Sequence, residues 1–467
     1  MGGFALLIER RSPLLALMVA ASAALVGVVA GVRPEFAIAA SLAIAFVIIV
    51  FADLTLGLAC FAGLTFLEQA AVGGPALSFA KVAGLALALS WLATVATRPA
   101  GSENFAAAHP IAAAMGLCFL GWVALSTTWA ELPAKSLAAL SSFALLATLF
   151  LIVYSAVRTR DDAITVITGF MAGVVLAATL GILKPPAVEA EGRISSTIGD
   201  PNELALLLIA GVMFALVFMW LPGRHPLLRL FGAVTAALAT YGLFLTVSRG
   251  GLIALAVALV LSIAIAGRLR PKAIAAVTVI VVASVGYFTM IAPDTATERL
   301  EILTEGQSRA NEGRSTTWQV GWRMFEDNPG HGVGAGQFQT ASIHYLLEPG
   351  AISRSDQIVD RPAVAHNSYL GIAAELGLVG AIGVVAIIAF ALSCLARAIR
   401  LARRIGDQEI DVLAVGTTLA LVAMLVGSFF LSNEYSKQLW LLLAFGPALL
   451  GVVRREAAAM PAESASP

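Results

Sequence analysis

A short polar stretch, His366-Asn367-Ser368-Tyr369, stands directly before a long apolar run in the sequence. An imidazole titrates near neutral pH and can take a proton from an attacking hydroxyl group. A single histidine in such a place is more often an interfacial side chain with a structural role. This one follows a long polar segment and opens an apolar span, so we treat His366 as a candidate general base.

Three arginines lie in three separate segments that the pattern of apolar runs places on one side of a membrane. Arg193 stands in EGRISS, Arg249 in TVSRGG and Arg314 in NEGRSTTW. A planar guanidinium can hold two phosphate oxygens at once, and neighbouring glycines let the backbone approach a ligand closely. Each arginine alone is typical of a solvated surface charge. Together with His366 they indicate a site that binds an anion and moves a proton.

No metal site and no cofactor are expected. None of the five histidines is paired with another at ligand spacing, and no carboxylate cluster accompanies them. The glycine-rich run HGVGAGQF gives G-x-G-x-G and lacks the strand and helix that frame a nucleotide-binding loop. Glu375, nine residues after His366, is expected to be a packing or hydrogen-bond partner for another helix.

The elements that position these residues are transmembrane helices. The 467 residues are 59% hydrophobic and 12% charged, with a mean hydropathy of +0.90, which leaves too little polar surface for a soluble domain. Apolar runs long enough to cross about 30 Å of hydrocarbon recur almost from end to end. We predict an all-α, polytopic transmembrane helical bundle of about 12–14 spans. The candidate spans are 14–32, 36–52, 54–72, 76–97, 110–129, 135–157, 162–183, 202–221, 226–247, 250–267, 272–292, 366–396, 411–431 and 436–453.

Basic residues predict the orientation of the bundle. Lysine and arginine concentrate in alternate connections, such as 397–404 and 454–455, which places these connections and both termini in the cytoplasm. The net charge of +0 gives no reason to expect a nucleic-acid partner. Within the long polar segment, RSTTWQVGWRMFEDNP predicts an amphipathic helix on or near the membrane surface.

The expected organisation has five parts. They are N-terminal transmembrane helices at 1–183; a transmembrane core at 184–292, with a short periplasmic loop at 184–202 and the SRGG turn; a large periplasmic loop at 293–365; C-terminal transmembrane helices at 366–455; and a disordered cytoplasmic tail at 456–467.

Four motifs, in this order, resemble those of the bacterial O-antigen ligase and polymerase superfamily: GRISSTIGDPNELALLL, TVSRGGLIALA, EGRSTTWQVGWRMFEDNPGHGVGAGQF and HNSYLGIAAELGLVGAIG. The resemblance implies a multi-pass enzyme of the bacterial inner membrane whose active site faces the periplasm. The implied reaction is an inverting, metal-independent glycosyl transfer. Its donor is a glycan on undecaprenyl diphosphate, and its acceptor is a hydroxyl of lipid A-core or of another glycan. Membrane lipids surround the enzyme.

The resemblance also implies a role for each candidate residue. Arg249 and Arg314 hold the diphosphate, Arg193 belongs to the same pocket, and His366 acts as general base or orients the acceptor. No residue separates a ligase from a polysaccharide polymerase. A secondary transporter is a third hypothesis, but it would place charged residues and broken helices near the bilayer midplane, whereas the candidates here lie at the ends of spans.

Overall fold

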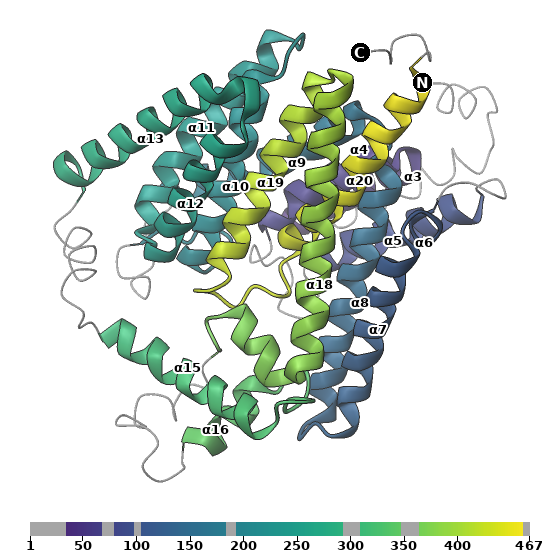
Figure 1. The fold of residues 1–467 in the computed structure, drawn as a ribbon, viewed down its shortest axis with the longest axis vertical. Helices are drawn as coiled ribbons and strands as arrows, with labels where there is room; N and C mark the ends of the chain where they lie inside the picture. Colours follow the sequence, from purple (N-terminus) through teal and green to yellow (C-terminus); the bar gives the residue numbers. More distant parts are fainter. Residues whose placement is uncertain are drawn as a thin grey trace.

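The computed structural model describes residues 34–67, 79–97, 104–183, 193–292, 309–346 and 364–460. Within these ranges the chain is all-helical, which confirms the predicted fold class (Figure 1). The elements are α3 (Pro34–Ala52), α4 (Leu54–Leu64), η1 (Thr65–Leu67), α5 (Phe79–Ala96), α6 (Phe105–Ala108), α7 (Pro110–Leu125), η2 (Ser126–Thr128), α8 (Pro133–Ala156), α9 (Arg160–Leu183), α10 (Pro201–Trp220), α11 (Pro226–Thr246), α12 (Arg249–Ile265), η4 (Gly267–Leu269), α13 (Arg270–Met290), α15 (Arg309–Asp327), α16 (Phe338–Leu346), α18 (Ser368–Ile405), α19 (Gln408–Gly427) and α20 (Lys437–Ala459).

Eight helices in the described ranges are long and apolar enough to cross a membrane, and four shorter apolar helices accompany them. Each span predicted within the described ranges coincides with a helix, although one of these helices is broken. The span predicted at 14–32 lies outside the described residues. The chain therefore forms a multi-pass helical bundle.

α10 is the central helix of this bundle. Every residue from Leu204 to Phe218 is buried, because α9, α11, α12 and α19 pack around it. A helix that is apolar on all sides belongs in such a core. The starts of α10, α12 and α20 lie at one end of the bundle, which is the lower end in Figure 1.

α18 corrects the prediction of one continuous span at 366–396. Gly377 has φ 64° and ψ −165°, a backbone conformation that glycine tolerates, and it separates a short helical segment from the long remainder of the helix. Three carbonyls before the break accept hydrogen bonds from distant groups. The Ala374 and Glu375 oxygens accept from the N–H groups of Val333 (3.0 Å) and Gly334 (2.8 Å), and the Leu376 oxygen accepts from Trp122 Nε1 (2.9 Å).

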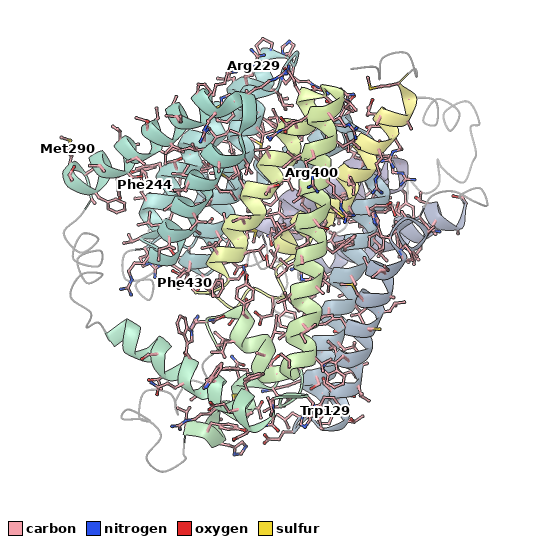
Figure 2. All side chains as sticks on the ribbon, in the orientation of Figure 1. Trp129, Arg229, Phe244, Met290, Arg400 and Phe430 are labelled. Carbon is pink, nitrogen blue, oxygen red and sulfur yellow. The ribbon has the colours of Figure 1, made fainter. Side chains whose placement is uncertain are left out.

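The long polar segment forms a small helical unit below the bundle. α15 confirms the predicted amphipathic helix, although its position relative to the membrane surface stays a prediction. α15 and α16 enclose a small hydrophobic cluster with Val320, Met324 and Phe338, separate from the main core. Between them, the turn at residues 328–337 packs on the α7–α8 tip, where the ring of Trp129 lies 5.3 Å from that of His331 (Figure 2).

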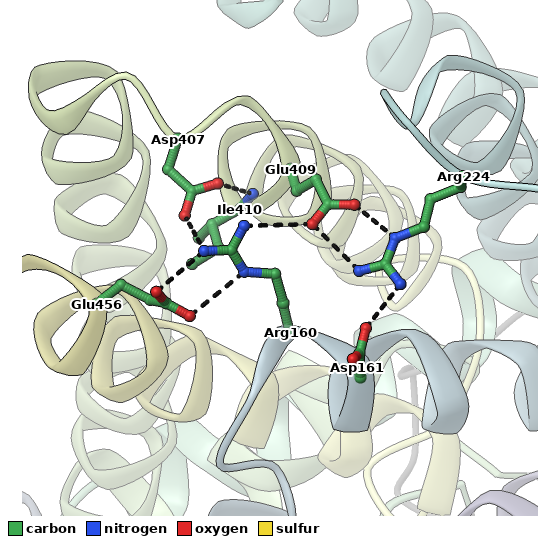
Figure 3. Close-up of polar contacts among 7 residues, drawn as sticks. All are labelled: Arg160, Asp161, Arg224, Asp407, Glu409, Ile410 and Glu456. Carbon is green, nitrogen blue, oxygen red and sulfur yellow. Dashed lines mark hydrogen bonds and ion pairs between the residues drawn. The ribbon is translucent and has the colours of Figure 1, made fainter. Parts of the chain in front are cut away.

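At the upper end, opposite this unit, ion pairs join four parts of the chain (Figure 3). Arg160, the first residue of α9, lies 3.2 Å from Asp407, 3.3 Å from Glu409 and 3.0 Å from Glu456. Arg224, in the α10–α11 connection, contacts Glu409 at 2.5 Å. The hydrogen bond to Glu409 is the main cause of the raised pKa of Arg224. We call these five residues the upper ion-pair cluster.

The C-terminal tail begins later than predicted. α20 continues to Ala459, so Glu456 is helical and paired with Arg160 rather than the first residue of a disordered tail. The ion pair joins the last turn of α20 to the start of α9, and hydropathy alone does not predict this contact. Residues 461–467 lie outside the described residues.

Candidate functional site

The turn between α11 and α12 holds Arg249. Val247 ends α11 in a left-handed conformation (φ 46°), and the Ser248 hydroxyl accepts from the Gly251 N–H at 3.2 Å. Serine is a favoured N-cap residue because its oxygen satisfies a free N–H of the first turn. Arg249 is thereby the first residue of α12, half-buried at the lower end of the bundle.

Arg193 contacts the same turn. Its Nε donates to the Thr246 carbonyl at 2.7 Å, and its Nη2 donates to Asn202 Oδ1 at 2.9 Å. The same Asn202 oxygen accepts from the Ser248 hydroxyl at 2.9 Å. Arg193 and Asn202 therefore fix the turn that carries Arg249. Sequence reasoning missed Asn202, although the Asp-Pro-Asn turn at the start of α10 was a signal.

Three of the four polar residues that open α18 have structural tasks. Asn367 is the N-cap, and its Oδ1 accepts from the N–H groups of Tyr369 and Leu370, both at 3.1 Å. The Ser368 hydroxyl donates to the Leu431 carbonyl at 2.9 Å, and the Tyr369 hydroxyl donates to the Leu425 carbonyl at 2.7 Å. These bonds hold the start of α18 against the end of α19.

His366 lies immediately before this cap in an uncommon backbone conformation. Its φ is +47°, in the left-handed region that few residues other than glycine, asparagine, aspartate and histidine adopt. Ala365, on one side, is buried in the small cluster of the α15–α16 unit, and Ser368, on the other, is buried against the α19–α20 connection. His366 is thus held half-buried between two packed elements.

The α19–α20 connection, residues 428–436, links the surroundings of Arg249 and His366. A Cβ placed on Gly250 would lie 2.9 Å from Phe430 Cβ, so the start of α12 is in close contact with this connection. The Ser368 N–H points to the carbonyls of Ser428 (2.9 Å) and Leu431 (3.1 Å). Figure 2 shows Phe430 below the α10–α12 group. One connection therefore contacts the starts of both helices.

Two further polar residues of this connection were missed from the sequence. Asn433 is buried, and its Oδ1 accepts from the hydroxyls of Ser368 (3.0 Å) and Ser428 (2.7 Å). Glu434 Oε2 is buried with no hydrogen-bond partner among the described residues, and burial raises the pKa of this carboxyl. The run SNEYS between two apolar spans was the available signal.

Arg314 lies in α15, in a helix that packs on the start of α18. A Cβ on Gly321 would lie 3.0 Å from Leu370 Cγ, which places α15 against the first turn of α18. Position 314 precedes Gly321 by seven residues, or about two turns and roughly 10 Å, on the same helix face. The backbone thus places Arg314 on the face of α15 that meets α18. Its side chain lies outside the described residues.

The glycine-rich turn binds a carboxylate of the chain itself. Glu375 accepts from the N–H groups of Gly336 (2.8 Å) and Phe338 (2.9 Å). Gly332, Gly334 and Gly336 all have positive φ, which turns their backbone around this side chain. The prediction that Glu375 is a hydrogen-bond partner is confirmed, and the N–H groups that a phosphate would need here are occupied.

The arrangement suits an anion at the lower end of the bundle. The N-terminus of a helix carries partial positive charge, and the α12 terminus adds the guanidinium of Arg249. A histidine at the neighbouring start of α18 supplies a group that can accept a proton. These are the requirements of a transfer reaction in which a phosphate group leaves and a hydroxyl group attacks.

Residues 233–385 match the protein-family model described as O-Antigen ligase. The matched segment contains Arg249, Arg314 and His366, whereas Arg193 precedes it and Glu434 follows it. No curated protein matches the chain.

Proposed function

We propose that this chain, which belongs to the O-antigen ligase/polymerase superfamily through residues 233–385, transfers a glycan from undecaprenyl diphosphate to an acceptor hydroxyl. The observation that carries the proposal is the contact of one connection, residues 428–436, with both Gly250 at the start of α12 and Ser368 at the start of α18. A binding group for the leaving phosphate and a base for the incoming hydroxyl thereby share one end of the bundle.

In the proposed reaction the acceptor oxygen attacks the anomeric carbon of the donor sugar from the side opposite the diphosphate. A new carbon–oxygen bond forms, the bond from carbon to the phosphate oxygen breaks, and the diphosphate leaves with the electron pair. His366 takes the proton of the acceptor hydroxyl. Such displacement inverts the configuration at the anomeric carbon.

The proposed role of the arginines is to neutralise the charge that the diphosphate gains as it leaves. Arg249 and Arg314 bind its oxygens, and the α12 N-terminus adds to their effect. Arg193 belongs to the same pocket by holding the turn, because its guanidinium donates to Thr246 and Asn202. No residue in this scheme requires a metal ion.

A secondary transporter is disfavoured by the hydrogen bonds at the break in α18. Broken helices of transporters direct free backbone groups at a substrate or ion. Here the carbonyls of Ala374, Glu375 and Leu376 already accept from Val333, Gly334 and Trp122. The break anchors the α15–α16 unit and leaves these groups engaged.

The direct test is an assay of purified protein in nanodiscs with an undecaprenyl-diphosphate-linked glycan, an acceptor glycolipid and a metal chelator. We expect formation of the inverted glycoside and release of undecaprenyl diphosphate. Absence of transfer to lipid A-core and to glycan acceptors alike would refute the proposal. In cells, deletion separates two acceptors: accumulated long lipid-linked polymer indicates a ligase, and accumulated single repeat units indicate a polymerase.

The periplasmic location of the site has its own test. Single cysteines at Gln339 in α16 and Gln408 in α19 are placed in a chain without its native cysteines. An impermeant thiol reagent should label position 339 in intact spheroplasts and position 408 only after lysis. The opposite pattern would place the site in the cytoplasm.

A further inference from the structure

An apolar pocket of about 260 Å³ lies between α7, α8, α18 and α20, on the side of the bundle away from α11 and α13 (Figure 1). Small residues of α7 leave this space open, because a Cβ on Gly116 would meet no atom within 4 Å. Leu117, which also lines the pocket, is 71% exposed. The pocket is therefore a recess in the outer, membrane-facing surface of the bundle.

The pocket occupies the upper half of the spans. α7 begins at the upper end, since the ring of His109 before it lies 5.2 Å from that of Phe390 in α18. The lining residues of α7 run from Ala112 to Leu120, which is eight helical steps or about 12 Å. One leaflet supplies about half of a hydrocarbon core of roughly 30 Å. The pocket thus matches the depth of one leaflet.

Arginines of α18 lie directly above this pocket. Phe390 lines the pocket, and Arg397 follows it by seven residues, or about two turns toward the upper end on the same helix face. Arg400 follows within one further turn, on the upper part of α18 (Figure 2). Both arginines are exposed. α18 therefore presents two positive charges at the end of the leaflet in which the pocket lies.

α20 adds a third positive charge at the same level. A Cβ on Gly446 would lie 2.5 Å from the Ala391 oxygen, so α20 packs closely on α18 at this point. Arg454 lies eight residues further along α20 and is exposed. Arg397 and Arg454 both lie within electrostatic range of the Cys394 thiol. The two guanidinium groups therefore belong to one patch formed by two helices.

The charges of this patch are not neutralised by the protein. At the same end, carboxylates pair with both arginines of the upper ion-pair cluster, and Asp411 pairs with Arg403 at 2.9 Å. No carboxylate of the described ranges forms such a pair with Arg397, Arg400 or Arg454. Basic residues are expected at a cytoplasmic end for orientation alone. Unpaired arginines above an apolar recess are a narrower pattern, which fits a ligand with an anionic head and an apolar tail.

We propose that the pocket binds one acyl chain of an anionic phospholipid whose phosphate lies between Arg397 and Arg454. A guanidinium holds phosphate oxygens in a planar fork, and basic residues at a membrane surface attract anionic lipids. A zwitterionic phospholipid carries a cation beside its phosphate, which the arginines repel. The site lies at the opposite end of the bundle from Arg249 and His366, so the inference does not depend on the proposed reaction. The bound lipid joins α7 to α18 and α20 and stabilises their packing.

The charge test uses purified full-length protein in detergent, titrated with phosphatidylglycerol or phosphatidylcholine and followed by native mass spectrometry and thermal unfolding. Phosphatidylglycerol should bind about tenfold more tightly and raise the unfolding temperature more. The double variant Arg397→Gln/Arg454→Gln should lose this preference. Arg268→Gln/Arg270→Gln, which removes two exposed charges elsewhere at the same end, should keep it. Equal binding of the two lipids by the wild type, or equal losses in the two double variants, would overturn the proposal.

The pocket test uses two glycines of α7. Gly116→Phe, which fills the pocket, should weaken phosphatidylglycerol binding by about tenfold. Gly121→Phe is the matched control, because a Cβ on Gly121 also meets no atom within 4 Å and Gly121 does not line the pocket. This variant should bind the lipid as the wild type does. Unchanged binding in Gly116→Phe, or equal weakening in both variants, would show that the pocket does not hold the chain.

A cross-linking measurement on the wild-type protein locates the lipid without any variant. Phosphatidylglycerol with a photoreactive group within an acyl chain should cross-link to the α7 segment around Met115, which lines the pocket. Excess unlabelled phosphatidylglycerol should compete, and excess phosphatidylcholine or undecaprenyl diphosphate should not. Competition by undecaprenyl diphosphate would assign the pocket to a polyprenyl lipid instead, and cross-links confined to other segments would reject the pocket.

Discussion

Gly250 lies so close to Phe430 that any added side chain would collide with it: a Cβ would be 2.9 Å from Phe430 Cβ and 3.1 Å from its ring. Gly250→Ala should therefore push the α19–α20 connection away from α12 and separate Arg249 from the start of α18. We expect a loss of about 1–3 kcal/mol of stability, typical of overpacking, and a larger loss of transfer activity. Thermal unfolding and transfer rate of the purified variant measure both. Gly121→Ala is the control, since a Cβ there meets nothing within 4 Å.

Arg249→Ala should lower kcat by about 10²–10³-fold, the usual effect of losing one donor to a charge that develops in the transition state. Arg249→Lys should recover little, because an ammonium cannot bind two oxygens in a planar fork. Arg314→Ala should behave in the same way. Arg270→Ala, at the exposed upper end of α13, should keep wild-type activity. A fully active Arg314→Ala variant would remove Arg314 from the diphosphate site.

His366→Asn tests the base without disturbing the backbone. Asparagine tolerates the left-handed conformation of this residue, whereas alanine adds about 1–2 kcal/mol of strain. Turnover should fall by about 10²–10⁴-fold in His366→Asn and in His366→Ala. The Asn variant should keep wild-type thermal stability and donor binding. Wild-type turnover in His366→Asn would place the base elsewhere.

Glu434 should make stability depend on pH. Burial raises the pKa of this carboxyl in the folded protein above its unfolded value, so folding favours the protonated form. Its stabilising effect is complete below the unfolded pKa, about 4.3, and is lost as pH rises through the folded pKa. Glu434→Gln should match the wild type in acid and unfold at a higher temperature than the wild type at neutral and alkaline pH. Thermal unfolding measured across this pH range gives the difference in unfolding temperature between the two proteins. Glu434→Gln should not be the less stable protein at any pH in this range.

Glu409→Gln should destabilise the upper ion-pair cluster. Glu409 pairs with both Arg160 and Arg224, and its side chain is only 14% exposed. Because the arginines are partly solvated, we expect a loss of about 1–3 kcal/mol rather than the larger cost of a fully buried pair. Glu131→Gln, which breaks an exposed contact with His344, should change stability by less than about 0.5 kcal/mol. Equal effects of the two changes would contradict a stabilising role for the cluster.

The helical bundle could be predicted because each span is a long apolar run, and hydropathy reports that directly. The break at Gly377 could not, because glycine within an apolar run is common in membrane helices and its φ is set by the turn at 328–337, more than forty residues away. Glu375 shows the same dependence on distant contacts, since its bonds to Gly336 and Phe338 decide whether it is a site residue or a structural one.

The candidate site was predicted in part for a related reason. Arg249 stands out because arginine is disfavoured in outer connections, and His366 stands out because it opens an apolar span directly after a long polar segment. Asn202, Asn433 and Glu434 were missed because their importance comes from a partner in another connection, as when one Asn202 oxygen serves both Arg193 and Ser248. The role of a polar residue at the end of a span depends on its partners in other connections, and these partners are apparent only in the folded structure.

The hydrogen bonds around Gly377 imply an order of assembly during synthesis. The partners of the broken segment, Trp122 and the turn at 328–337, precede it in the chain. They have left the ribosome before Gly377 is made, and N-terminal elements generally fold first. The newly made segment can therefore dock onto partners that have already been synthesised. Delayed folding of the 328–337 turn would leave two carbonyls, those of Ala374 and Glu375, without their hydrogen bonds in an incompletely folded chain.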